Sequence, residues 1–118
     1  MERGIQTIAA AVLGAVLLLV GILGFVNDPV LGLFDVNATH NVVHLLAGAI
    51  GLWAGVWGGI AASRWYNRVF GIVYAAVAVL GFAGVSAFVS LLALNGADNW
   101  LHALIGAVQL VVGFGMKG

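Results

Sequence analysis

The chain has 118 residues, of which 64% are hydrophobic and 7% are charged, with four basic and four acidic side chains and a formal net charge of zero. A soluble domain of ordinary composition has about 25% charged residues, so this chain is too apolar to present a water-facing surface. The mean hydropathy of +1.18 instead predicts a small protein embedded in a lipid bilayer. The lack of a basic patch argues against a nucleic-acid partner, and the lack of cysteine excludes a disulfide scaffold.

Four apolar segments follow one another along the chain and predict membrane-spanning helices. They cover about residues 5–26, 40–62, 69–94 and 99–116. The first carries no charged residue and, at about 1.5 Å per residue, is long enough to cross a hydrocarbon core of about 30 Å. The links between the segments are short, so consecutive helices should run antiparallel. We therefore expect an all-α fold, an antiparallel four-helix transmembrane bundle that fills residues 1–118 as one domain.

The few charges fall on opposite sides of this bundle. All basic residues lie on the side shared by the two termini and the link 63–68, namely Arg3, Arg64, Arg68 and Lys117. The other side has only acidic groups, namely Asp28, Asp35 and Asp98. Basic residues near helix ends mark the cytoplasmic face, so we expect a multi-pass protein of the cell membrane with both termini in the cytoplasm. Trp65 and Tyr66, in the inner link, are expected to be interfacial anchors.

Small residues give the second and fourth segments a face suited to close helix packing. In lipid, apolar helices associate by close approach across glycine and alanine. Residues at steps of three and four form these faces, which we expect to point inward: His44, Gly48, Gly51, Gly55 and Gly58 in one segment, and His102, Gly106, Gln109 and Gly113 in the other. We expect the Gln109 side chain to form a hydrogen bond between helices.

The same faces reveal an internal repeat. A shift of 58 residues aligns one half of the chain with the other and pairs Asn37 with Asn95, Asn41 with Asn99, His44 with His102, Gly48 with Gly106 and Gly55 with Gly113. The shared pattern is Asn-x-x-His-x-Leu-x-Gly-Ala. It predicts two pseudo-repeated helical hairpins, related by an axis along the membrane normal.

Three motifs in the chain are similar to those of a known family. They are NVVHLLAG at residues 41–48, RWYNRVFG at 64–71 and ADNWLH at 97–102. With them the chain resembles a family of small prokaryotic four-helix membrane proteins, domain of unknown function 4383, over nearly its whole length. The resemblance implies the four-span architecture, and it implies no activity.

Two histidines occupy equivalent places in the repeat. His44 and His102 each follow, by three residues, an asparagine that could cap its helix, Asn41 or Asn99. Both imidazoles should therefore lie about one turn below the outer surface, at matching depth. One interpretation is that they form a hydrogen bond across the bundle and hold its helices together.

A second interpretation is a metal site. His40 precedes His44 by one helical turn, and Asp98 flanks His102. Neutral imidazoles are common metal ligands, and His40, His44, His102 and Asp98 together could hold Zn²⁺ or a similar ion.

Two organic cofactors are further alternatives for the histidine pair. His44 and His102 could ligate a b-type haem, but the outer half of the chain has no arginine or lysine to pair with the haem propionates. A chlorophyll-type pigment needs one axial histidine and no such pairing, and a glycine-rich groove would accommodate it. The cofactor, if any, stays unknown at this point.

Other functions find little support in the sequence. The middle of the predicted spans holds no aspartate, glutamate, lysine or arginine, which argues against a pump or carrier, and no nucleophile and base pair indicates an enzyme. We therefore expect a non-catalytic structural or accessory subunit, whose partners are the bilayer and either a second copy or a larger membrane complex. The alternative is a metal- or pigment-binding protein. Asn41, Asn99 and Gln109 are expected to be structural polar groups.

Overall fold

The computed structural model describes residues 3–118, and residues 1–2 of the predicted domain lie outside this part. The described chain is all-helical, as predicted, apart from an isolated bridge between Val30 and Phe34. Its elements are α1 (Ile5–Val26), α2 (Ala38–Trp53), the π-helical turn η1 (Ala54–Gly58), α3 (Gly59–Phe82), α4 (Ser86–Leu92) and α5 (Gly96–Gly115).

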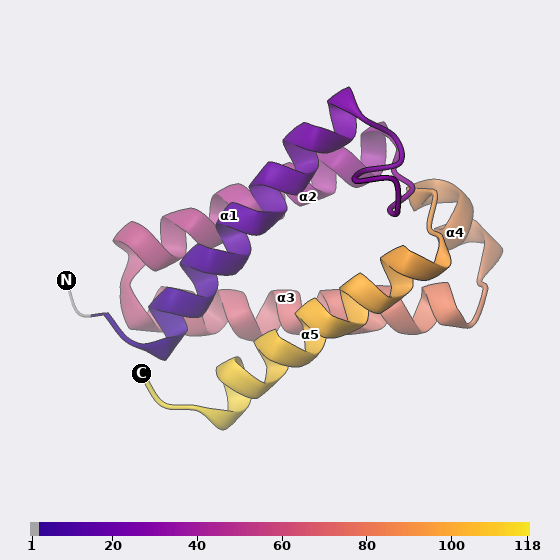
Figure 1. The fold of residues 1–118 in the computed structure, drawn as a ribbon. Helices are drawn as coiled ribbons and strands as arrows, with labels where there is room; N and C mark the ends of the chain where they lie inside the picture. Colours follow the sequence, from indigo (N-terminus) through magenta and orange to yellow (C-terminus); the bar gives the residue numbers. More distant parts are fainter. Residues whose placement is uncertain (1–2) are drawn as a thin grey trace.

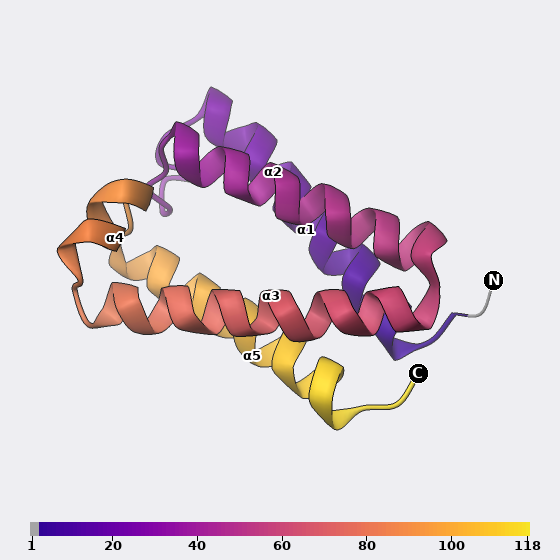
Figure 2. The same ribbon diagram turned by 180° about the vertical axis from the view of Figure 1, so that it is seen from behind.

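The helices pair into two antiparallel hairpins. Helix α1 packs along α2, and α3 packs along α5. The two hairpins come close together at the end where both termini lie, and their ribbons diverge toward the opposite end (Figure 1). At that opposite end lie α4 and the segment between α1 and α2, as the view from behind also shows (Figure 2). We call these the inner end and the outer end.

The predicted link at 63–68 is wrong, because this stretch lies within α3. The chain reverses earlier, through η1 and Gly59, whose φ of 86° is favourable for glycine alone. Two of its polar residues, Ser63 and Asn67, are buried. The Ser63 hydroxyl donates to the Ala54 carbonyl at 3.0 Å, and the Asn67 amide donates to Oε1 of Gln6 at 3.0 Å.

The third predicted segment, 69–94, is also divided differently. Helix α3 ends at Phe82, the chain bends at Gly84 with φ 68°, and the short helix α4 follows. Nearby, Trp65 is 67% exposed, as an interfacial anchor should be, whereas Tyr66 is 4% exposed and is not an anchor. The Tyr66 hydroxyl donates to the Ala47 carbonyl of α2 at 2.8 Å, and this bond joins the two hairpins.

Glycines set the separation within each hairpin. A methyl group on Gly48 would collide with the backbone of α1 at Leu18, and one on Gly14 would collide with the backbone of α2 at Leu52. In the second hairpin, a methyl group on Gly106 would lie 2.7 Å from the Ala75 nitrogen. Most of the predicted small-residue faces are indeed buried, and Gly58 is partly exposed.

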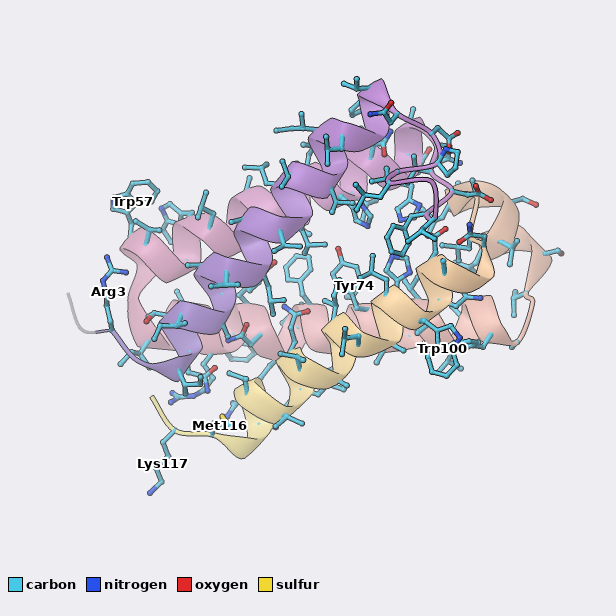
Figure 3. All side chains as sticks on the ribbon, viewed as in Figure 1. Arg3, Trp57, Tyr74, Trp100, Met116 and Lys117 are labelled. Carbon is cyan, nitrogen blue, oxygen red and sulfur yellow. The ribbon has the colours of Figure 1, made fainter. Side chains whose placement is uncertain are left out.

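The polarity of the molecule is inverted relative to a water-soluble protein. Its buried residues include many polar side chains at both ends, while its outer surface carries most of the large apolar ones. Figure 3 shows Trp57 and Trp100 pointing away from the bundle. Two helical stretches are long and apolar enough to cross a membrane, Ile5–Val26 and Ala38–Phe82, the latter combining α2, η1 and α3.

At the inner end, polar side chains hold the last turn of α5. The final carbonyls of a helix have no partner within the helix itself. The Gln6 amide of α1 donates to Val112 at 2.7 Å and to Met116 at 3.0 Å. Arg68 of α3 donates from Nε to the Gly113 carbonyl at 2.7 Å. Both α1 and α3 are thereby attached to the end of α5.

Replacing Gly48 with alanine should destabilise the protein by about 1–3 kcal/mol, because the new methyl group would meet backbone atoms that cannot rotate aside. The measurement is the thermal unfolding midpoint of the detergent-purified protein. Gly115→Ala is the matched control, since Gly115 is also helical but has open space where the methyl group would lie. Equal unfolding midpoints for the two variants would contradict this packing.

Candidate metal centre

Two asparagines begin the helices that carry the histidines. Oδ1 of Asn37 accepts the backbone N–H of His40 at 2.9 Å, and Oδ1 of Asn95 accepts that of Asp98 at 2.9 Å, which is the usual N-cap geometry. Each cap also holds a neighbouring segment through its Nδ2, since Asn37 donates to the Leu91 carbonyl at 2.9 Å. The caps thus fix both helix starts and the outer segments together.

The asparagines predicted as caps lie one turn inside their helices. The side chain of Asn41 packs against Gly24 of α1, and that of Asn99 packs against Gly81 of α3, in each case filling the space that a methyl group on the glycine would occupy. Asn41 and Asn99 are therefore not N-caps. They lie at the contact between the paired helices, next to the buried histidines.

The structure brings all three histidines of the chain together at the outer end. His40, His44 and His102 are 1%, 2% and 1% exposed. The His40 and His44 ring centroids are 4.3 Å apart, and the His102 centroid lies 5.3 Å from the first and 5.9 Å from the second. One ligand nitrogen from each ring lies within 4.8 Å of the other two. Helix α2 contributes two rings and α5 the third, so the cluster spans both hairpins.

Hydrogen bonding determines which nitrogen of His40 is free. Its Nδ1 lies 2.8 Å from the Leu92 carbonyl at the end of α4. A carbonyl can only accept, so the proton is on Nδ1 and the lone pair of the neutral ring is on Nε2. A backbone carbonyl on the far nitrogen is the usual support for a metal-binding histidine.

Most of the remaining ring nitrogens have no partner. Nε2 of His40, both nitrogens of His44 and Nδ1 of His102 are buried without a hydrogen bond to any residue in 3–118. The predicted hydrogen bond between His44 and His102 is therefore not formed by these atoms. A buried polar group without a partner costs about 1–3 kcal/mol, so each of these nitrogens is a candidate to bind a ligand.

Tyr74 forms one wall of the cluster and was not among the predicted site residues. Its ring centroid lies 5.5 Å from that of His102, and its hydroxyl is buried without a partner in the described chain. Figure 3 shows Tyr74 projecting from α3 into the space between the hairpins. Its spacing of three residues from Gly71 and seven from Gly81 placed it on the inward face of α3, which is the signal that could have found it.

Asp98 is close to His102 in sequence but is engaged elsewhere. Its Oδ2 accepts the backbone N–H of Asn95 at 3.0 Å, which completes a capping box at the start of α5. It does not join the histidine group found in the described residues.

Gln109 lies deeper in the bundle, two turns below His102. Its side chain is completely buried, and neither its amide nitrogen nor its oxygen has a hydrogen-bond partner among residues 3–118. The predicted bond from Gln109 to another helix is thus not present. Its backbone packs against Gly71 of α3, so its position is set by the same glycine contact that holds the hairpin together.

Comparison with known proteins identifies a family and no function. No curated protein and no solved structure matches the chain significantly. The family described as "Domain of unknown function (DUF4383)" matches residues 7–115, which include all three histidines and every helix apart from the first two residues of α1. The resemblance expected from the motifs is confirmed, and the chain belongs to the DUF4383 family.

Proposed function

We propose that this protein is a membrane-embedded metal-binding protein, and that its ligands are His40, His44 and His102. The observation that carries the proposal is the convergence of three buried imidazoles from two hairpins, with ligand nitrogens within 4.8 Å of one another. A single transition-metal ion would give a partner to all three rings at once, and imidazole is a good ligand for zinc, copper, iron and nickel.

Ring packing favours an ion over a macrocycle. A haem or chlorophyll-type pigment needs a flat slot beside its axial histidine. Here the rings of His40 and His44 are in edge contact at 4.3 Å between centroids, and the ring of His102 lies close to both. The space next to each imidazole is therefore filled by another imidazole, which excludes a flat macrocycle, whereas a single ion needs only the ring nitrogens that lie within 4.8 Å of one another.

Membrane insertion is the second part of the proposal. The apolar exterior, the buried polar ends and the two long apolar helical stretches support it. Because the stretch Ala38–Phe82 reverses at Gly59, we assign one span on each side of this turn, and with α1 and α5 the chain would form a four-span bundle. The basic residues at the inner end favour a cytoplasmic location for both termini, which puts the histidines near the outer face.

Equivalent contacts in the two hairpins support their common origin by internal repetition. The contact of Gly24 with Asn41 recurs, 57 and 58 residues later, as the contact of Gly81 with Asn99. The cap of Asn37 on His40 recurs in the same way as the cap of Asn95 on Asp98. The repeat therefore places His40 and Asp98 at equivalent positions, and the third ligand would come from one hairpin alone.

A structural or accessory role remains a second candidate. An apolar groove on the surface of α3 and α5 is lined mainly by alanines. These are Ala75, Ala78, Ala103 and Ala107, and Val79, Phe82 and Leu110 complete the lining. Such small-residue surfaces allow close contact with another transmembrane helix. Under either candidate we propose a binding role without catalysis.

Metal analysis of detergent-purified protein tests the main proposal. After chelation and reloading, we expect one ion per chain, and both His44→Ala and His102→Ala should lose it. Gln109→Leu is the matched control, because Gln109 is an equally buried polar residue on the same face of α5, and this variant should keep the ion. Loss of one ligand should also abolish the rise in unfolding temperature that the ion produces in the wild type.

The Asp98→Asn variant distinguishes a site of three histidines from a site in which Asp98 is a further ligand. Because the carboxylate is committed to the cap of α5, we expect the variant to bind one ion per chain as the wild type does, while its unfolding midpoint falls slightly. Metal content is the measurement. Loss of the ion from a folded Asp98→Asn protein would show instead that Asp98 is a ligand.

The absence of cysteine from the chain allows a direct test of orientation. Single cysteines at two exposed positions, Asp35→Cys at the outer end and Lys117→Cys at the inner end, lie on opposite sides of the proposed membrane. A membrane-impermeant thiol reagent added to intact cells should label the first and spare the second. The reverse labelling pattern would show that the histidine cluster is near the cytoplasm.

A further inference from the structure

We infer that the ion held by His40, His44 and His102 is monovalent copper, Cu⁺. This inference rests on the proposed function and specifies its ligand. It follows from two features of the cluster, the charge of its donors and their number.

The donors supply no negative charge. All three are imidazoles, and no carboxylate or thiolate joins their group anywhere in residues 3–118. Asp98 lies one turn nearer the outer end of α5 and accepts from the Asn95 backbone. Because the cost of burying an ion grows with the square of its charge, a divalent ion on neutral ligands costs about four times as much as a monovalent one.

The number of donors also favours Cu⁺. Structural Zn²⁺ sites are almost always tetrahedral with four protein ligands, whereas Cu⁺ is stable with three nitrogen donors in a plane. Three nitrogens at about 2.0 Å from one ion lie about 3.5 Å apart in that geometry. The ring nitrogens of the cluster are within 4.8 Å of one another, so small rotations of the imidazoles would complete it.

Tyr74 allows a divalent ion at this site to be distinguished from Cu⁺. A divalent ion at this site would need an anion, and Tyr74 is a group that could become one as a phenolate, because its ring lies 5.5 Å from that of His102 and its hydroxyl is buried without a partner in the described chain. A Cu⁺ ion has no such need, so the tyrosine would stay a neutral wall of the site. The behaviour of Tyr74→Phe therefore distinguishes the two kinds of ion.

The test compares Cu⁺ and Zn²⁺ on the detergent-purified full chain. Cu⁺ is titrated without oxygen, with ascorbate present and bicinchoninate as the competing chelator, and Zn²⁺ is titrated against its own chelator. We expect one Cu⁺ per chain, with Zn²⁺ bound at least about 100-fold more weakly. X-ray absorption of the copper-loaded wild type should show three nitrogen neighbours, a measurement that needs no variant.

Tyr74→Phe should bind Cu⁺ as tightly as the wild type. Tyr66→Phe is the matched control. Tyr66 is the other tyrosine of the chain and is also buried in α3, but its hydroxyl donates a hydrogen bond to the Ala47 carbonyl. If Zn²⁺ binds as tightly as Cu⁺, or if Cu⁺ binding requires the Tyr74 hydroxyl, the inference is wrong while the histidine site stands. Failure of both ions to bind to the wild type would overturn the proposed function as well.

Discussion

Contact between helix backbones at glycine is the constraint on which the structure depends. Gly48 lets α2 approach α1, and Gly106 lets α5 approach α3, until backbone touches backbone. Such contact fixes both the separation of two helices and their rotation about their own axes. His44 and His102 lie one turn before these glycines, on the same faces, so the packing of each hairpin turns its histidine inward, and the two ring centroids lie 5.9 Å apart.

The buried polar side chains at the inner and outer ends of the molecule differ in their hydrogen bonding. At the inner end, Gln6 and Arg68 donate to the otherwise unpaired carbonyls of α5, and these contacts are explained by folding alone. At the outer end, an equally buried set of imidazoles is left with unpartnered nitrogens. Ionisable side chains inside an apolar protein commonly have a functional role, and this burial of three imidazoles supports the metal site proposed above.

The sequence was sufficient where the determining interaction is local. Glycine and histidine spacing predicted the helical faces, most of whose residues are buried. It misplaced the turn between α2 and α3 because the partner that buries Asn67 is Gln6, 61 residues away. The bond from His40 to Leu92 joins residues 52 apart and was equally hidden. The sequence did not show that Asp98 takes part in the cap of α5, because a carboxylate at the third position of a helix serves a cap as readily as a metal.

The histidine cluster lies at the end of the molecule opposite the covalent connection between the two hairpins. The chain passes from one hairpin to the other once, through η1 and Gly59 at the inner end, while the three imidazoles lie at the far end. His40 and His44 move with the first hairpin and His102 with the second. A bound ion would therefore join the two hairpins at the end farthest from their covalent connection, in addition to the hydrogen bonds of Asn37 to Leu91 and of His40 to Leu92, and it would resist any rotation that spreads the two halves.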